Sequence, residues 1–445
     1  MWESVTDMAQ LQPYEQYQPI DYDYVKQLPT GWQLWKIAHA FNLIGSGTTP
    51  ESGNEKFYIN GSINWINTGD LNDGVLESCK NKITKEAFKK HSVLKIYPKG
   101  TLLIAMYGAT IGKVAVTNIE CCTNQACCAL SKSKILTNKF TLYWFIANRK
   151  NIVNLSYGGG QPNISQDVIK KLKIPVPPLD TQNRIVEYLD KKNNEIDRFI
   201  RNKERLIYLL EISRKRKIFD AITKGINQGI GLKDSCIEWF GYVPKHWIVT
   251  RAKVISKVFV PDRNKPELNL EKNGIPWVTT EVIGEEVLDE ETLSNYVSRK
   301  SFKEIENRAL PKNSIVATCV GSFGISSFVT FECFINQQLQ AYTELKINPY
   351  YLRYIIQSSE VYFNKFSTQT TLMYVNKKTF AELPVLCPPI DEQNQIIDFI
   401  KHEVSGINLA ISKAQQEITA IKEYREALIT DLVTGKRCLP PSIPK

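Results

Sequence analysis

The chain has 445 residues, of which 43% are hydrophobic and 23% charged, and carries a formal net charge of +10. This length favours two domains, and the composition excludes a disordered or fibrous protein, while the charge permits an anionic partner. The N-terminus lacks the basic start and apolar run of a signal peptide, and no apolar stretch of about eighteen residues occurs, so a cytoplasmic protein is expected.

The first long region, residues 20–178, follows a short N-terminal extension. It contains short β-rich runs such as "TLLIAMYG", probable helices such as "TLYWFIANRK", and turn residues between them. This pattern predicts a compact globule of mixed α and β structure. Four cysteines in "ECCTNQACCALS" lack metal-ligand spacing and a nearby histidine, so we expect a structural role for Cys121, Cys122, Cys127 and Cys128.

A long helix is predicted next, over residues 179–226. The double proline Pro177-Pro178 suits the last residues before a helix, Asp180 is placed to cap it, and Gly225 is placed to end it. Apolar residues recur at alternating steps of three and four, which is the seam of a coiled coil. The apolar seam residues are Val186, Leu189, Ile196, Ile200, Ile207 and Leu210, and polar residues at Asn193, Lys203, Arg214 and Lys217 interrupt them.

The second half of the chain repeats the first at offsets of 211 to 215 residues. "VPPLDTQNRIV" (176–186) returns as "CPPIDEQNQII" (387–397), and "GTLLIAMYGATIGKVAVT" (100–117) as "NSIVATCVGSFGISSFVT" (313–330). Residues 227–389 are therefore predicted to form a second, similar globule, and residues 390–435 a second helix that Asp391 caps and Gly435 ends. Its seam residues are Ile397, Ile400, Val404, Ile407, Ile411, Ile418, Ile421 and Leu428, with Ala414, Arg425 and Leu432 in the same register.

The predicted fold class is α+β. Two similar globules are joined by two long helices of about 36 seam residues, or roughly 54 Å each. Because the second globule follows the first helix, a returning second helix makes an antiparallel coiled coil with pseudo-two-fold symmetry. The remaining segments are an extension at 1–19 and a tail at 436–445.

Enzyme signatures are absent from the sequence. "YGATIGKVA" has three residues between Gly108 and Gly112 where a phosphate-binding loop needs four, and Val114 follows the lysine where Ser or Thr is required. No histidine lies in a metal-type pair, and no methyltransferase loop of the Asn/Asp-Pro-Pro-aromatic type occurs. We therefore expect a non-catalytic chain that binds neither a cofactor nor a metal.

Several loops are rich in small residues and hydrogen-bond donors, which suits contact with phosphates and base edges, although such loops can also be ordinary turns. Two lysines in the basic segment 79–95 are candidates for phosphate contacts, or else part of a solvated face. The candidate DNA-binding residues are Ser46, Thr48, Thr49, Lys89, Lys90, Tyr107, Thr110, Lys113, Tyr157, Gln161, Asn163, Ser322, Ser326, Thr368, Gln369, Thr370, Tyr374 and Asn376.

The chain resembles the specificity subunits of type I restriction-modification systems. The resemblance rests on the doubled P-P-[LI]-D-x-Q-N-x-I phrase, "LPTGWQLWKIAHAF", "GSGTTP", "WINTGDL", "GQPNIS" and "DSCIEWFGYVPKHW", and it covers nearly the whole chain after residue 20. The sequence departs from the family at Cys236, where a small glycine is usual, and at "TQTTLMYVN", which stands where the first copy has "GGGQPNIS".

The resemblance implies a specific function. Each globule would be a target-recognition domain for one half of a split double-stranded DNA sequence, and the helices would set the spacer and dock two methyltransferase subunits. Those subunits would methylate adenine with S-adenosylmethionine, and restriction subunits would use ATP and Mg²⁺, while this chain would bind none of the three.

Two other interpretations stay open at this point. One is a bifunctional chain that combines specificity with methylation or cleavage, which requires a cofactor loop or metal carboxylates. The other is a coiled-coil scaffold with two binding heads that do not recognise DNA.

Overall fold

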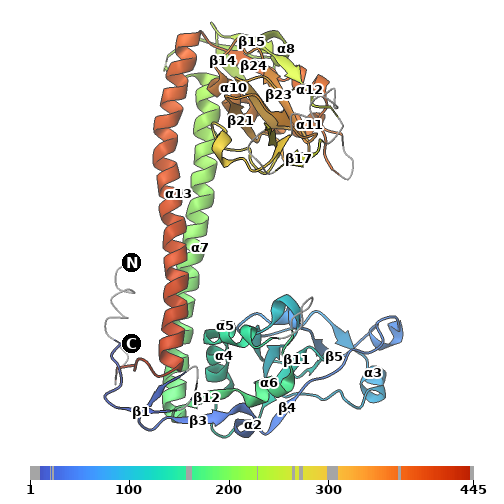
Figure 1. Ribbon diagram of the computed structural model, residues 1–445, viewed down its shortest axis with the longest axis vertical. Helices are drawn as coiled ribbons and strands as arrows, with labels where there is room; N and C mark the ends of the chain where they lie inside the picture. Colours follow the sequence, from blue (N-terminus) through green and yellow to red (C-terminus); the bar gives the residue numbers. More distant parts are fainter. Residues whose placement is uncertain are drawn as a thin grey trace. The chain divides into compact units, whose positions relative to one another are not determined.

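The computed structural model describes residues 11–20, 22, 25–156, 163–227, 229–262, 266–269, 274–297, 309–368 and 372–440. The chain divides into two compact units. Unit 1 comprises Met1–Asn202 and Gln416–Lys445, and unit 2 comprises Lys203–Gln415. Each unit contains a head of strands and short helices, together with part of each of two long helices, α7 (Leu179–Lys224) and α13 (Ile390–Val433) (Figure 1).

Head 1, the head of unit 1, is built on a five-stranded sheet of order β4-β11-β8-β9-β6. The strands of the whole of head 1 are β1 (Tyr17–Pro19), β2 (Gln27–Pro29), β3 (Gln33–Lys36), β4 (Leu43–Gly45), β5 (Ile63–Ile66), β6 (Val75–Leu76), β7 (Lys82–Ile83), β8 (Leu102–Ala105), β9 (Val114–Thr117), β10 (Cys122–Thr123), β11 (Cys127–Ser131) and β12 (Lys173–Val176). Its helices are α2 (Ile37–Ala40), α3 (Lys85–Lys90), α4 (Asn138–Ala147), α5 (Arg149–Asn154) and α6 (Gln166–Lys171), with 3-10 turns η1 (Glu55–Phe57), η2 (Thr68–Asp70) and η3 (Gly108–Thr110).

Head 2, the head of unit 2, has a four-stranded sheet of order β16-β23-β20-β21. The strands of the whole of head 2 are β13 (Leu232–Asp234), β14 (Tyr242–Pro244), β15 (Ile248–Arg251), β16 (Lys257–Phe259), β17 (Leu268–Asn269), β18 (Ile275–Val278), β19 (Tyr296–Val297), β20 (Ser314–Thr318), β21 (Ser326–Val329), β22 (Phe334–Ile335), β23 (Leu339–Thr343) and β24 (Pro384–Cys387). Its helices are α8 (Ala252–Ile255), α10 (Pro349–Ser358), α11 (Glu360–Phe366) and α12 (Lys377–Ala381), with the 3-10 turn η4 (Glu290–Thr292).

The repeat in the sequence is also a repeat in strand pairing. In head 1, β8 lies between β9 and β11, β10 pairs parallel with β5, and β12 pairs with β3. In head 2, β20 lies between β21 and β23, β22 pairs parallel with β18, and β24 pairs with β15. Each head therefore has the predicted α+β fold, and the two heads form the predicted tandem repeat.

The central strands are apolar on both faces because both faces of the sheet are covered. In β8, Leu102 and Ile104 pack in the core that contains α4, whereas Leu103 and Ala105 pack in a second core on the other face. A continuous apolar run such as "LLIA" is what a strand buried on both sides requires. The same run therefore gives head 1 its two hydrophobic layers.

Both long helices begin directly after their double prolines. The carbonyl of Pro178 accepts a hydrogen bond from the residue four positions later at 3.0 Å, and so does the carbonyl of Pro389. The second proline is thus the N-cap, where its missing N–H costs nothing. Asp180 and Asp391 lie one residue inside, in the first turn, so the predicted capping role is wrong. Their carboxylates still face the positive end of the helix.

The glutamine of the repeated phrase joins each helix start to its head. Gln182 is fully buried. Its Oε1 accepts a hydrogen bond from the backbone N–H of Thr137 at 2.8 Å, and its Nε2 donates to the carbonyls of Ile135 at 2.7 Å and Pro177 at 2.9 Å. Thr137 is the N-cap residue of α4. One side chain therefore fixes the start of α7 against the start of α4.

Gln393 makes the equivalent contacts in unit 2. Its Oε1 accepts from the backbone N–H of Asn348 at 2.9 Å, and its Nε2 donates to the carbonyl of Pro388 at 2.8 Å. Asn348 is the N-cap residue of α10. The phrase is written twice because it builds the same helix-to-head junction in each unit.

Within unit 1, the part of α7 that belongs to the unit runs antiparallel to the last part of α13. Asp197 pairs with Arg425 at 2.5 Å, and Arg184 donates to the carbonyl of Pro440, which follows α13. A residue later in α7 is thus paired with a residue earlier in the segment after residue 416, as antiparallel helices require. Arg425 occupies a seam position, and its charge is met by Asp197.

Within unit 2, the other parts of the two helices are also antiparallel. Arg214 donates to the Oδ1 atom of Asn408 at 3.0 Å, and Lys217 pairs with Glu403 at 2.5 Å. These two seam cations interrupt the apolar pattern of α7, and each has a polar partner on α13. The apolar seam residues predicted in both helices are buried or half-buried.

Glycines end both helices, as predicted. Gly225 has φ 72° and Gly435 has φ 76°, which is the left-handed conformation that a helix stop commonly requires and that glycine adopts without strain. Within the described residues, no helix is long and apolar enough to cross a membrane.

Candidate functional site

Four segments of head 1 are joined by hydrogen bonds just beyond its strands. The backbone N–H of Gly47 donates to the Thr123 hydroxyl at 3.0 Å and to the Asn124 carbonyl at 3.2 Å, and the Thr49 hydroxyl donates to Gln125 Oε1 at 2.7 Å. The loop after β4 is therefore tied to the loop before β11. We name the whole set loop cluster 1; its segments are residues 46–50, 106–113, 124–126 and 163–165.

Backbone contacts attach the other two segments of loop cluster 1. The N–H of Met106 donates to the Ala126 carbonyl at 2.8 Å, and the N–H of Ile164 donates to the Met106 carbonyl at 2.9 Å. Tyr107 and Asn163 form an antiparallel β-bridge. Two candidate residues that are far apart in the sequence are thus adjacent.

Gly47 is required by this packing. A Cβ atom at this position would lie 1.7 Å from the carbonyl oxygen of Thr123. We expected small residues in these loops to admit a bound partner. At Gly47 the close approach is instead made by the protein's own backbone, so this glycine shapes the cluster.

Head 2 repeats the arrangement with the same backbone bonds. The N–H of Cys319 donates to the Gln338 carbonyl at 2.8 Å, and the N–H of Val375 donates to the Cys319 carbonyl at 2.9 Å. Val320 and Tyr374 form the β-bridge that corresponds to Tyr107 and Asn163. We name this set loop cluster 2; its segments are residues 319–325, 336–338 and 372–376, with Thr368, and residues 279–284, whose Thr280 hydroxyl donates to Gln338 Oε1 at 3.3 Å.

An arginine clamps two loops in head 1. Arg149, at the start of α5, donates through Nε to the carbonyl of Gly112 at 3.1 Å and pairs through Nη2 with Asp73 at 2.5 Å. Asp73 also accepts a hydrogen bond from the N–H of Val114 at 3.1 Å. The turn between β8 and β9 is thereby held against the loop before β6.

A different arginine does the same in head 2. Arg353, in the middle of α10, is only 6% exposed, and donates to the carbonyls of Ser326 at 3.0 Å and Gly284 at 2.9 Å. Burial lowers the pKa of this guanidinium from its usual value, whereas the nearby Glu286 acts in the opposite direction. The two arginines come from different helices, so a clamp between these loops exists in both heads by different means.

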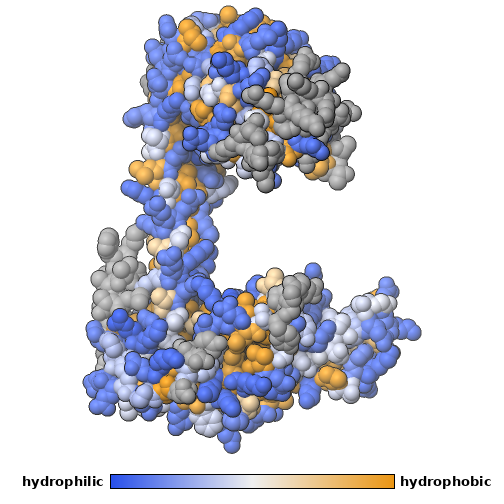
Figure 2. All heavy atoms as spheres, viewed as in Figure 1, coloured by the Kyte–Doolittle hydropathy of each residue, from blue (hydrophilic) through white to orange (hydrophobic). Residues whose placement is uncertain are grey.

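The described candidates of head 1 fall into two groups. Ser46, Thr48, Thr49, Tyr107, Thr110, Lys113 and Asn163 belong to loop cluster 1. The Thr110 hydroxyl donates to the Tyr107 carbonyl at 2.9 Å and so stabilises its own turn. Lys89 and Lys90 lie apart on α3, where Lys90 pairs with Glu51 at 3.5 Å. Figure 2 shows hydrophilic residues over the α3 region.

The described candidates of head 2 are Ser322, Ser326, Thr368, Tyr374 and Asn376. Asn376 caps α12 by accepting from the N–H of Thr379 at 3.0 Å. Ser326 is the first residue of β21 and is fully buried, as is every residue of that strand. Its side chain is not available to DNA, and we remove Ser326 from the candidates.

Four candidates lie outside the described residues: Tyr157, Gln161, Gln369 and Thr370. Sequence reasoning also missed several residues of the clusters. Leu372, Met373 and Ile325 are exposed apolar residues of loop cluster 2, and they were passed over because hydrogen-bond donors were sought. The two clamping arginines had no local signal either.

The four adjacent cysteines are structural in their placement. Cys122 lies in β10, Cys127 and Cys128 lie in β11, and all four are buried. Burial raises the pKa of Cys121, Cys122 and Cys128 to about 12, so the reactive thiolate is disfavoured. Among the described residues, no group of three or more His, Cys, Asp or Glu side chains could hold a metal ion.

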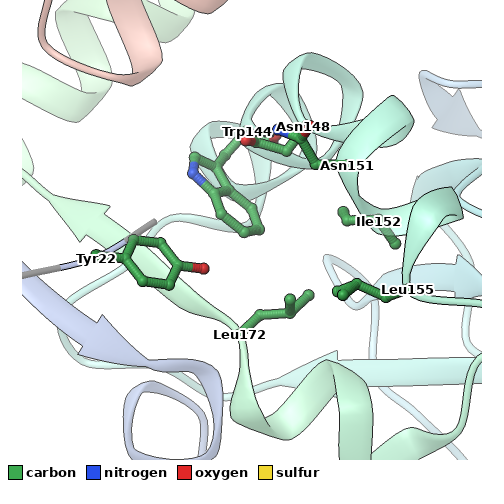
Figure 3. Close-up of a pocket in the computed structure, with 7 residues that line it drawn as sticks. All are labelled: Tyr22, Trp144, Asn148, Asn151, Ile152, Leu155 and Leu172. Atoms are coloured by element: carbon green, nitrogen blue, oxygen red, sulfur yellow. Dashed lines mark hydrogen bonds between the residues drawn. The ribbon is translucent and has the colours of Figure 1, made fainter. Parts of the chain in front are cut away.

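A small cavity lies between α4, α5 and the segment that precedes β12. It is lined by Tyr22, Trp144, Asn148, Asn151, Ile152, Leu155 and Leu172 (Figure 3). Its volume is about 10 Å³, which admits at most one water molecule. The buried indole N–H of Trp144 has no partner within the described structure. A nucleotide-sized cofactor does not fit.

Known proteins share both the sequence and the fold. The family model described as "Type I restriction modification DNA specificity domain" matches residues 29–206 and 244–420. The type I restriction enzyme MjaIX specificity subunit of Methanocaldococcus jannaschii is 25% identical over 431 residues, covering 93% of this chain and 95% of that protein. The Escherichia coli EcoR124I/EcoR124II specificity subunit is 29% identical over 162 residues, covering 35% of this chain and 40% of its own.

Solved structures agree with this fold. A chain from a study of the assembly and conformational transition of a type I R-M system has a TM-score of 0.70 at 15% identity, covering 92% of this chain and 99% of its own. The HsdS subunit from Thermoanaerobacter tengcongensis has a TM-score of 0.51 at 14% identity, covering 92% of this chain and 98% of its own. Since the family model matches each copy of the repeat, this chain belongs to the family of type I restriction-modification DNA specificity subunits.

Proposed function

We propose that loop clusters 1 and 2 each bind one half of a split double-stranded DNA target. The observation that carries this proposal is the equivalence of the clusters. The same backbone bonds, from Met106 and Ile164 in head 1 and from Cys319 and Val375 in head 2, hold two sets of loops whose exposed side chains differ. Equal frames with unlike side chains suit two different half-sites.

The long helices supply the second part of the proposal. In unit 2, α7 exposes Leu206, Tyr208, Leu209 and Ile212, whereas a solvated helix face normally carries polar residues. Figure 2 shows hydrophobic residues among hydrophilic ones on the helices. We name these four residues the α7 apolar face and propose that helices of a methyltransferase subunit dock there.

The complete assembly would contain two methyltransferase subunits and restriction subunits. The methyltransferase subunits would bring S-adenosylmethionine and methylate one adenine in each half-site, and the restriction subunits would bring ATP and Mg²⁺. The role of this chain would be to bind and orient DNA for them.

The decisive experiment reads adenine methylation across a genome. This chain is co-expressed with its methyltransferase partner, and methylated sites are mapped by single-molecule sequencing. We expect a motif of two short specific parts around a fixed unspecific gap. A continuous motif, or no methylation from a stable complex, contradicts the proposal and favours the scaffold without DNA recognition.

Docking of the methyltransferase subunit is tested by placing negative charges on the α7 apolar face. The double variant Leu209→Glu and Ile212→Glu should lose co-purification with the methyltransferase subunit, because two carboxylates would have to be buried. Val254→Glu, at an exposed apolar residue of α8, is the matched control and should retain it. Equal retention by both variants would place the partner elsewhere.

The spacer is tested by insertion. Four residues added near Ser213 lengthen α7 by about 6 Å, which corresponds to one or two base pairs. Because Arg214 faces Asn408, a matched insertion beside Asn408 preserves the helix pairing on both sides. The gap in the methylation motif should lengthen while both half-sites stay unchanged, and altered half-site bases would refute the role of the helices as a spacer.

A further inference from the structure

Loop cluster 2 presents an unusual run of apolar side chains. Leu372, Met373 and Tyr374 are consecutive and are 64%, 40% and 39% exposed, and Ile325 on the neighbouring loop is 38% exposed. A single exposed apolar residue is ordinary, but a run of them on a loop is not expected without a function. The run therefore calls for a binding role.

Backbone bonds hold this run in place. The carbonyl of Met373 accepts a hydrogen bond from the N–H of Gly321 at 2.9 Å, and the carbonyl of Tyr374 accepts one from the N–H of Thr368 at 2.9 Å. Tyr374 also bridges Val320. The exposed side chains thus project from an anchored backbone, which limits the entropy that binding would cost.

Head 1 is more polar at the equivalent positions. The N–H of Ala105 donates to the carbonyl of Lys113 at 2.8 Å, and the N–H of Thr318 donates to the carbonyl of Ile325 at 3.0 Å, so Ile325 takes the place of Lys113. In the aligned sequence, Leu372-Met373-Tyr374 takes the place of Gln-Pro-Asn at 161–163. Lys113 and Gln161 are thus replaced by the aliphatic Ile325 and Leu372, and a proline is replaced by Met373.

Duplex DNA offers one apolar feature to such a surface. Thymine carries a 5-methyl group in the major groove, and no other unmodified base does. Contact between that methyl and an aliphatic side chain removes apolar surface from water, which is favourable. Lys113 and amide side chains in head 1 are suited instead to acceptor atoms and phosphates.

We propose that head 2 recognises its half-site through thymine 5-methyl groups, contacted by Leu372, Met373 and Ile325, whereas head 1 relies on hydrogen bonds. This inference rests on the proposed function of loop cluster 2 as a DNA-binding surface. It predicts at least one essential A·T pair in the half-site of head 2.

The test removes the methyl group from the DNA and leaves base pairing intact. The purified complex with its methyltransferase partner is titrated with duplexes of the mapped target in which one thymine at a time is replaced by deoxyuridine. We expect binding to weaken about three- to fivefold per contacted methyl. The sensitive positions should lie in one half-site only.

Variants assign the effect to loop cluster 2. The triple variant Ile325→Asn, Leu372→Asn and Met373→Gln replaces each proposed methyl contact by a polar side chain of similar size, and it should bind the thymine and deoxyuridine duplexes equally. Lys113→Ala, at the position equivalent to Ile325, should leave the deoxyuridine effect unchanged. So should Val361→Asn, at an exposed apolar residue on α11.

Three results would overturn the inference: no sensitive thymine, a half-site without A·T pairs, or sensitivity that persists in the triple variant. Insertion of these side chains from the minor groove would give the first result, because the 5-methyl lies in the major groove. A split motif that is insensitive to deoxyuridine refutes this inference alone, whereas the absence of a split motif refutes the proposed function.

Discussion

Units 1 and 2 agree most closely at their helix starts and differ most at their loop clusters. Gln182 and Gln393 make matching hydrogen bonds to the N-cap residues of α4 and α10. In the loop clusters the backbone bonds also match, yet Lys113 in one head corresponds to Ile325 in the other. The same backbone hydrogen bonds thus accept either a charged or an apolar exposed side chain at one position. The stability that these bonds provide can therefore be tested separately from the binding properties of the exposed side chains.

The helix starts should give the largest effect on stability. Gln182→Leu removes three hydrogen bonds to buried or part-buried backbone groups and should destabilise unit 1 by about 3 kcal/mol, and Gln393→Leu, which removes two, should destabilise unit 2 by about 2 kcal/mol. Hydrogen exchange resolves the two units within the full chain. Asn183→Leu, at an exposed neighbour, is the control, and an equal response to all three would show that these junctions are not important.

The helix ends should respond unequally to alanine. A Cβ at Gly435 would lie 2.6 Å from Pro29 Cδ, whereas at Gly225 the nearest atom would be Trp247 Cζ2 at 3.3 Å. Both positions have positive φ, which costs alanine about 1 kcal/mol. Gly435→Ala should therefore destabilise by about 2 kcal/mol or more, and Gly225→Ala by about 1 kcal/mol, in thermal or denaturant unfolding. The reverse order would contradict the packing described here.

Removal of the two clamping arginines should lower the free energy of unfolding by different amounts in thermal or denaturant unfolding. Arg353→Met leaves two carbonyls without their donor in a buried site and should cost about 2 kcal/mol, whereas Arg149→Met acts at a part-exposed pair and should cost about 1 kcal/mol or less. Faster hydrogen exchange should be confined to the loops each arginine holds, at 284–286 and 108–112. Exchange that rises across the whole head would indicate a general packing defect.

The smallest effect is expected at α3. Lys89→Ala should weaken DNA binding by the complex a few-fold and reduce the slope of log affinity against log salt by about 1, without changing the target sequence. Lys99→Ala, an exposed lysine of head 1 outside α3 and loop cluster 1, is the control. An unchanged salt slope would mean that α3 is an ordinary solvated helix.

The repeat, the seams and the glycine helix ends were predictable because each depends on local spacing. Alternating steps of three and four specify a helix face, and a glycine after such a run specifies its end. Cys236, where the resemblance led us to expect a glycine, adopts φ 56°, a conformation that favours glycine.

The remaining errors come from contacts that spacing does not encode. Asp180 looked like a cap, but Pro178, two residues earlier, occupies the cap position, so Asp180 lies inside the helix. Arg149 reaches a residue 76 positions away, and Arg353 reaches one 69 positions away, so neither clamp could be seen locally. Leu372 and Met373 were not among the candidates because hydrogen-bond donors were sought, whereas the contacts proposed for them are apolar.

The make-up of the two units also affects their synthesis on the ribosome. Unit 2 is one continuous stretch, whereas unit 1 needs residues 416–440, including Leu428 and Leu432, which pack in its core. Translation therefore delivers everything unit 2 needs before unit 1 can bury its last core residues. Head 1, although made first, should be the last to become fully protected, and protease digestion of chains stalled at increasing lengths would reveal that order.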